Sequence, residues 1–116
     1  MLKSKEIIVD NSFLNIDKLK RLVIAKKIYW TKHCLNRLNQ REISINDVKE
    51  AIIKGKIIEN YKDDYPYPSC LICGKNIENK TLHIVCGIND DFIYVITAYY
   101  PNVIMWEDNM ETRRGK

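Results

Sequence analysis

Two apolar runs separated by a polar turn make up residues 82–100, LHIVCGINDDFIYVITAYY. In the first run His83, Val85 and Gly87 alternate with Leu82, Ile84, Cys86 and Ile88. Successive side chains of a strand point to opposite faces, so we expect the His83 side chain on the face opposite Leu82 and Ile84. The second run is almost entirely apolar or aromatic, which is typical of a central strand covered on both faces. The two runs predict strands at 82–88 and 92–100, and the turn between them leaves open whether Tyr99 shares a face with His83.

Two more strands are expected before this pair, because the apolar period is near 2 from Lys56 onward. They cover residues 57–61 and 69–74, and the loop DDYPYP at 63–68 separates them. Gly74-Lys75-Asn76 forms the next turn. The sequence therefore predicts a four-stranded antiparallel meander.

Three helices are expected before the sheet, because the apolar period there is near 3.6. Ser12 is the predicted N-cap of the first helix, and Thr31 that of a second helix that ends near Gln40. Ser44 and Asp47 form a capping box for the third helix, and Gly55 is its predicted left-handed stop. The inward-facing residues are expected to be Ile16, Leu19, Leu22 and Val23, then Cys34, Leu35 and Leu38, then Val48 and Ile52.

Helices followed by an antiparallel sheet indicate an α+β fold, with the N-terminal helices packed on one face of the four-stranded meander. The length of 116 residues predicts a single domain, 1–116. Within it we expect a tail at 1–11, a helical part at 12–55, the sheet at 56–100 and a C-terminal segment at 101–116 without assigned structure.

Composition indicates a globular protein of the cytoplasm. The chain is 46% hydrophobic and 29% charged, and it has no apolar run of the roughly 18 to 20 residues that a membrane span needs. Its N-terminus lacks the apolar block of a signal peptide, and four cysteines are too few for a secreted disulfide scaffold. We therefore expect reduced thiols and no membrane partner.

Charge is distributed unevenly along the chain, whose net charge is +4. Residues 18–41 contain eight basic residues and no acidic one, whereas acidic residues outnumber basic ones elsewhere. Such a basic region favours an anionic partner, RNA first. The alternative is a pair of solvated helices in a lysine-rich protein.

The two histidines are the residues best suited to proton transfer near neutral pH. His33 shares a helix face with Arg37 and Arg41, and an arginine can hold a phosphate by bidentate hydrogen bonds. With His83 and Tyr99, this set suits metal-independent cleavage of a phosphodiester. The alternative is that His33 and its arginines are solvated, and that His83 is hydrogen-bonded on the sheet. Aromatic side chains that could stack on RNA bases, or pack over the sheet edge, are Tyr65, Tyr67, Tyr94, Tyr99, Tyr100 and Trp106.

The cysteines offer a competing interpretation, a small zinc site. Cys70-x-x-Cys73 and His83-x-x-Cys86 have the spacing of two ligand pairs. Residues i and i+3 of a strand point to opposite faces, however, so ligation would require a turn in place of each strand. We therefore expect no metal ion and no other cofactor, and keep a zinc-binding domain as an alternative.

Several short motifs resemble a known family. In order they are HCLNRLNQREIS (33–44), GKIIENY (55–61), DYPYPSCL (64–71), LHIV (82–85) and ITAYYP (96–101), followed by Trp106 and Arg113-Arg114. Over residues 29–114 this pattern resembles a bacterial domain-of-unknown-function family, numbered four-two-five-eight. Cys73 departs from the pattern, which has an aliphatic residue there; this suits a buried thiol better than a zinc site shared by the family.

The resemblance implies a function, because the family is similar to the RelE- and BrnT-type ribonuclease toxins of toxin–antitoxin pairs. It implies an endoribonuclease that cleaves single-stranded RNA, including mRNA on the ribosome, by attack of the ribose 2′-hydroxyl, and a zinc-finger antitoxin as partner. The catalytic residues are then expected to be His33, Arg37, His83 and Tyr99. The substrate-binding residues are expected to be Arg41, Asp64, Trp106, Arg113 and Arg114. The alternative is a non-catalytic module that binds RNA or an acidic protein.

Overall fold

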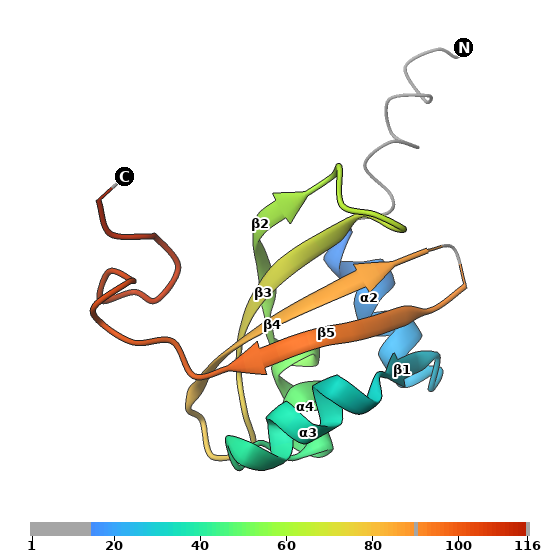
Figure 1. Ribbon diagram of the computed structural model, residues 1–116, viewed down its shortest axis with the longest axis horizontal. Coiled ribbons are helices and arrows are strands. Elements are labelled where there is room, and N and C mark those ends of the chain that lie inside the picture. Colours follow the sequence, from blue (N-terminus) through green and yellow to red (C-terminus); the bar gives the residue numbers. More distant parts are fainter. Residues whose placement is uncertain (1–14, 90, 116) are drawn as a thin grey trace.

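The structure is a computed structural model that describes residues 15–89 and 91–115. Within these residues it contains three helices and five strands, so the predicted α+β class is confirmed (Figure 1). The elements are, in chain order, α2 Ile16–Ile24, β1 Ile28–Trp30, α3 Lys32–Gln40, α4 Ile45–Lys54, β2 Lys56–Tyr61, β3 Ser69–Lys75, β4 Thr81–Ile88 and β5 Ile93–Tyr99. No helix in this part of the chain is long and apolar enough to cross a membrane.

The sheet has the strand order β1-β5-β4-β3-β2. Strands β2 to β5 form the predicted antiparallel meander. The prediction of four strands was incomplete, because β1 pairs in parallel with β5 and makes the sheet mixed. Tyr29 lies opposite Tyr94 in this pair, and so short a strand is specified by its distant partner rather than by its own pattern.

Two of the predicted helix starts are confirmed by their caps. Thr31 Oγ1 accepts a hydrogen bond from the Cys34 N–H at 3.0 Å. Ser44 and Asp47 form the reciprocal capping box, with N···O distances of 2.9 and 3.2 Å. The first described helix instead begins after Asn15, whose side-chain oxygen accepts from two backbone N–H groups of the first turn. The predicted cap Ser12 lies outside the described residues.

Gly55 ends α4, but the predicted left-handed conformation is wrong. Its backbone is extended, with φ −98° and ψ −176°. Close approach explains the glycine, because a Cβ there would lie 2.5 Å from the Ala51 carbonyl oxygen and 2.8 Å from that of Cys73. The residue is needed for contact between helix and sheet rather than for a turn.

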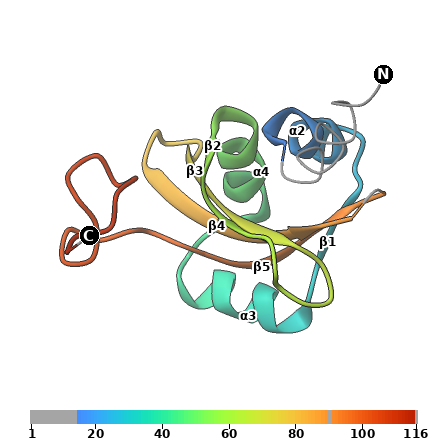
Figure 2. The ribbon, with the colours of Figure 1, turned by 90° about the horizontal axis from the view of Figure 1, so that it is seen from above.

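The helices lie on both sides of the sheet, which corrects the prediction of a single helical face. Figure 2 shows α2 and α4 on one side and α3 on the other, next to β5. The side chains of α2, α4 and the sheet form the main core, and Cys34 and Leu38 of α3 join it, whereas Leu35 is 39% exposed instead of inward. Fully buried members of this core include Leu19, Val48, Ile52, Ile72, Leu82, Ile84, Ile88, Ile93 and Val95.

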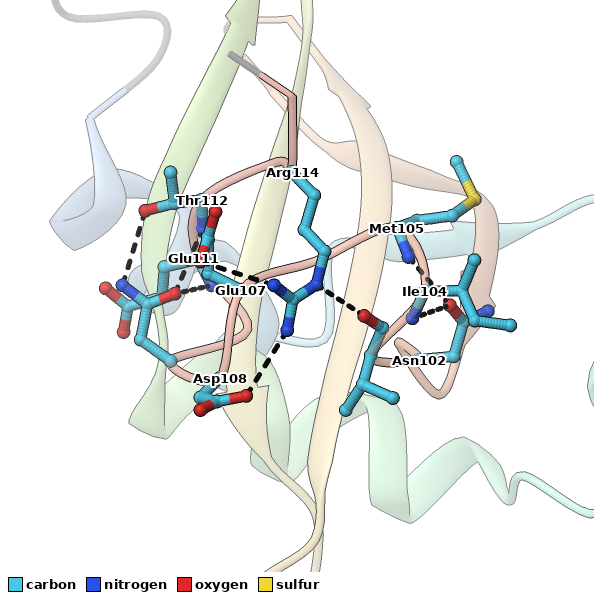
Figure 3. A network of polar contacts seen from close by, with 10 residues as sticks. Asn102, Ile104, Met105, Glu107, Asp108, Glu111, Thr112 and Arg114 are labelled. Atoms are coloured by element: carbon cyan, nitrogen blue, oxygen red, sulfur yellow. Dashed lines mark hydrogen bonds and ion pairs between the residues drawn. The ribbon is translucent and has the colours of Figure 1, made fainter.

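The C-terminal segment, residues 100–115, folds into turns beyond the end of β5 (Figure 1). Asn102 accepts hydrogen bonds from the N–H groups of Ile104 and Met105, and Arg114 donates to the Val103 carbonyl oxygen (Figure 3). The segment returns to the sheet through Trp106, which is 2% exposed. It thereby covers part of the sheet face that α2 and α4 leave open.

Candidate functional site

His83 is the centre of the polar cluster under the C-terminal segment. It projects from β4 on the face opposite Leu82 and Ile84, as predicted, but it is 0% exposed. The indole of Trp106 packs edge-on against the imidazole, with ring centroids 4.5 Å apart. The ring therefore lies on the predicted face of the strand but cannot contact RNA directly.

Both ring nitrogens of His83 have partners. Nε2 lies 2.7 Å from the backbone oxygen of Met110, and Nδ1 lies 3.3 Å from the hydroxyl of Tyr99. A carbonyl oxygen only accepts, so we assign the ring proton to Nε2. Burial lowers the pKa of His83 below its ordinary value and favours the neutral ring. In the neutral ring Nδ1 is an acceptor, and the Tyr99 hydroxyl donates to it.

Tyr99 contacts His83 and is itself partly exposed. It lies directly opposite His83 in the pairing of β4 and β5, which settles the open question of register, and its side chain is partly exposed. Burial raises the pKa of its phenol, so the hydroxyl is protonated at neutral pH. Because it donates its proton inward to Nδ1, its oxygen retains lone pairs for an incoming group.

A charged brace holds the C-terminal segment against β2. Arg113 donates to both carboxylate oxygens of Glu59, with N···O distances of 2.7 and 3.1 Å, and its guanidinium carbon lies 4.6 Å from the centre of the Trp106 ring. The pKa of Arg113 is raised by this pairing. Tyr61 donates to Glu59, and burial together with this hydrogen bond raises the pKa of Tyr61 to about 12. The brace fixes Trp106 over His83.

Arg41 connects α3 to β5 close to Tyr99. Its Nη1 donates to Thr97 Oγ1 at 3.0 Å and to the Ala98 carbonyl oxygen at 2.7 Å. Arg37 and His33 are exposed on the same helix. His33 precedes Arg41 by eight residues, about 12 Å of helical rise. The structure therefore brings Arg41 towards Tyr99, but it does not bring the two imidazoles together over one phosphate.

The other predicted substrate-binding residues are engaged within the protein. Trp106 is buried, so its ring has no face free for a base, and Arg113 is paired with Glu59. Arg114 is held by Val103, Glu107 and Asp108 within the C-terminal segment (Figure 3). Asp64 is exposed and accepts a hydrogen bond from the buried hydroxyl of Ser69. Arg41 remains the predicted binding residue nearest to Tyr99.

The zinc alternative does not fit this geometry. Cys70 and Cys86 lie opposite each other in β3 and β4, with their sulfur atoms 4.0 Å apart, on the core side of the sheet. Cys73 pairs with His83 on the other side. The described residues contain no group of three or more His, Cys, Asp or Glu side chains that could hold a metal ion.

Sequence reasoning missed Glu59 and Tyr61 as members of the cluster. They alternate in β2 and pair with Leu71 and Ser69 of β3, so a period-2 pattern was available to put them on one face. Their partner Arg113 is 54 residues away from Glu59, and no local pattern links the two. The backbone oxygen of Met110 has no side-chain signature at all.

Comparison with known families identifies the domain. The family described as Domain of unknown function (DUF4258) has a model that matches residues 30–100. The chain belongs to this family. The DUF4258 match runs from the end of β1 to just beyond β5, and so contains Arg41, Glu59, His83 and Tyr99 but not Trp106 or the rest of the C-terminal segment. No curated protein and no solved structure matches the chain.

Proposed function

We propose that this DUF4258 protein is a metal-independent endoribonuclease that cleaves single-stranded RNA. One observation carries the proposal: the hydroxyl of Tyr99, a partly exposed residue, donates to a buried neutral histidine, beside an arginine-bearing helix. A phenol backed by a proton acceptor can take a proton from a sugar hydroxyl and pass its own inward. The pKa shifts of His83, Tyr99 and Tyr61 cluster here, as is common at functional sites.

The proposed reaction is an internal transfer at phosphorus. The ribose 2′-oxygen attacks the adjacent phosphorus, its proton moves to the Tyr99 oxygen, and the Tyr99 proton moves to Nδ1 of His83. The O2′–P bond forms and the P–O5′ bond breaks. The 5′-oxygen leaves with the bonding electrons and takes a proton from water, which gives a 2′,3′-cyclic phosphate end and a 5′-hydroxyl end. His83 then returns its extra proton to water through Tyr99. Tyr99 replaces His83 as the group that contacts RNA, because the His83 ring is covered.

Cationic side chains of α3 are suited to the RNA backbone. Arg41 follows α3 and is anchored to β5 at Thr97 and Ala98, and Arg37, exposed one turn earlier, carries a guanidinium that can balance charge that develops on the phosphate. His33, exposed one turn further towards the start of the helix, can form a hydrogen bond with a neighbouring phosphate. Lys32, exposed at the start of α3, extends this surface, whereas the basic residues of α2 lie on the other side of the sheet.

The similarity of the family to RelE- and BrnT-type toxins adds a biological setting to the proposal. In that setting the protein is the toxin of a toxin–antitoxin pair, and its protein partner is an antitoxin of the zinc-finger type. The helices followed by an antiparallel meander are compatible with such a toxin. Fold alone does not define the activity, so the polar cluster around Tyr99 is what supports cleavage.

A direct test uses purified protein, end-labelled single-stranded RNA and excess EDTA. The proposal predicts fragments with 5′-hydroxyl and 2′,3′-cyclic phosphate ends. The basic region also favours a second candidate, a non-catalytic RNA-binding module. Retarded but intact RNA at enzyme excess would support that candidate and contradict cleavage.

A further inference from the structure

A cavity of about 440 Å³ opens at the end of the sheet beside Tyr100, the residue that follows β5. Its walls come from three segments: Arg41, Glu42 and Asp47 at the junction of α3 and α4, the β3–β4 turn, and Tyr100. Pockets for small ligands occupy ~300–1,000 Å³. The cavity is therefore large enough for a planar group such as a nucleobase.

The walls are held by hydrogen bonds that do not depend on a ligand. The Ile77 N–H donates to Asp47 Oδ1 at 3.3 Å and ties the β3–β4 turn to α4. Asn76, which is 2% exposed, donates to the Tyr100 hydroxyl at 3.2 Å and accepts from the Lys80 N–H at 2.8 Å. These contacts fix the turn and the aromatic ring relative to each other, so the cavity is largely pre-formed.

The charges that line the cavity disfavour a phosphate. Three carboxylates, those of Glu42, Asp47 and Glu78, face two cations, those of Arg41 and Lys80. Both Asp47 oxygens already accept hydrogen bonds, and Glu78 lies 3.6 Å from Lys80. Such a lining suits a neutral ligand that both donates and accepts hydrogen bonds.

Two adjacent residues retain hydrogen-bonding capacity. Across residues 15–89 and 91–115, the Glu42 carboxylate makes no hydrogen bond or ion pair, although it lines the cavity. Within the same residues, Arg41 uses only Nη1, for Thr97 and Ala98, and its other nitrogens make no hydrogen bond. The cavity thus offers an acceptor next to a group of donors, together with the ring of Tyr100 and the side chain of Ile77 as apolar surface.

We propose that this cavity binds the guanine base of the RNA nucleotide beside the cleaved phosphate. Guanine carries two acceptors, O6 and N7, that suit an arginine, and two donors, N1–H and N2–H₂, that suit a carboxylate. Arg41 and Glu42 supply these complementary groups, and Tyr100 directly follows Tyr99 in the chain. The inference rests on the proposed ribonuclease function and names the base that this function would prefer.

The test measures nucleotide binding to the full-length protein without turnover. Guanosine 3′-monophosphate, and the adenosine, cytidine and uridine analogues, are titrated while backbone amide signals are followed by NMR. Guanosine monophosphate should shift the amides of Glu42, Ile77, Lys80 and Tyr100 and should bind most tightly. Glu42→Gln should weaken its binding roughly tenfold, while Glu107→Gln, in the C-terminal segment, leaves it unchanged.

Three outcomes would overturn the inference. All four nucleotides could bind equally well, or the changes in the amide signals could map to residues outside the cavity. A lysine-rich peptide could also change the amide signals of the cavity when no nucleotide does. An RNA-cleavage assay separates this failure from failure of the proposed function. Cleavage without preference for guanine contradicts the guanine pocket alone. Selective binding of guanosine monophosphate without any cleavage contradicts the ribonuclease alone.

Discussion

The Tyr99 hydroxyl and His83 Nδ1 lie 3.3 Å apart across neighbouring strands, and Tyr99 is partly exposed whereas His83 is buried beneath the C-terminal segment. The Met110 carbonyl oxygen on the far side of the ring fixes the direction of this hydrogen bond. The pair thus links a partly exposed tyrosine to an internal proton acceptor.

Replacing His83 should destabilise the fold. His83→Ala removes a fully buried ring that packs on Trp106 and leaves the Met110 oxygen with only the weak Cys73 thiol as a donor. We expect a loss of about 2–4 kcal/mol in the free energy of unfolding, measured by urea denaturation. His33→Ala, at an exposed position, should change it by less than about 0.5 kcal/mol. Equal effects of the two variants would contradict the buried environment of His83.

Stability should also fall on mild acidification. The pKa of His83 is lowered in the folded protein, so below the ordinary histidine pKa of about 6.5 the unfolded chain binds a proton that the folded chain does not. The contribution of His83 to the free energy of unfolding is complete above that pH. It decreases as the pH falls towards the pKa that His83 has in the folded protein. The free energy of unfolding should therefore decrease less between pH 7.5 and pH 5 in the His83→Gln variant than in the wild-type protein. The same slope in both proteins would refute the assignment.

The brace between β2 and the C-terminal segment should be visible in the titration of Tyr61. The pKa of Tyr61 is about 12, through burial and the hydrogen bond to Glu59. Glu59→Gln removes the negative charge but keeps the shape, so we expect the Tyr61 pKa to move down while remaining above that of a free tyrosine. Absorbance of tyrosinate, with Tyr61→Phe to identify the signal, measures the shift. An upward movement would be inconsistent with the brace.

Gly74 should tolerate no side chain. A Cβ at Gly74 would lie 1.9 Å from the Ala51 carbonyl oxygen, where β3 passes under α4. Because the neighbouring Ala51 atoms all belong to the backbone, Gly74→Ala should lower the free energy of unfolding by about 3 kcal/mol or more, or prevent folding. Gly115 has nothing within 4 Å of its Cβ position and has φ +82°, so Gly115→Ala should cost only about 1 kcal/mol. Thermal denaturation of the two variants compares these costs.

Local chemistry made part of this fold predictable. The caps at Thr31 and Ser44 and the alternation around His83 depend on neighbouring residues, and each was found where the pattern predicted it. Strand β1 was missed because its partner β5 lies more than 60 residues away. Gly55 was misread because its constraint comes from the Cys73 backbone on another strand rather than from its own turn.

The candidate site shows the same division between local and distant information. The residue type and the strand face were enough to name His83 as a candidate site residue from the sequence. Its burial depends on Trp106 and Met110, which lie in a segment without regular structure. Sequence could not show that this segment turns back over the sheet. Tyr99 could be named from its motif, whereas its hydrogen bond to His83 depends on the bulge and register between β4 and β5.

The cleavage rate of Tyr99→Phe on single-stranded RNA in EDTA tests the account most directly. The variant keeps the ring and removes only the hydroxyl, so the fold should persist and cleavage should fall roughly 100-fold or more. Tyr29→Phe, at an exposed position in β1, is the matched control and should cleave at the wild-type rate. A folded Tyr99→Phe protein that cleaves RNA as fast as wild type would contradict the central role of Tyr99.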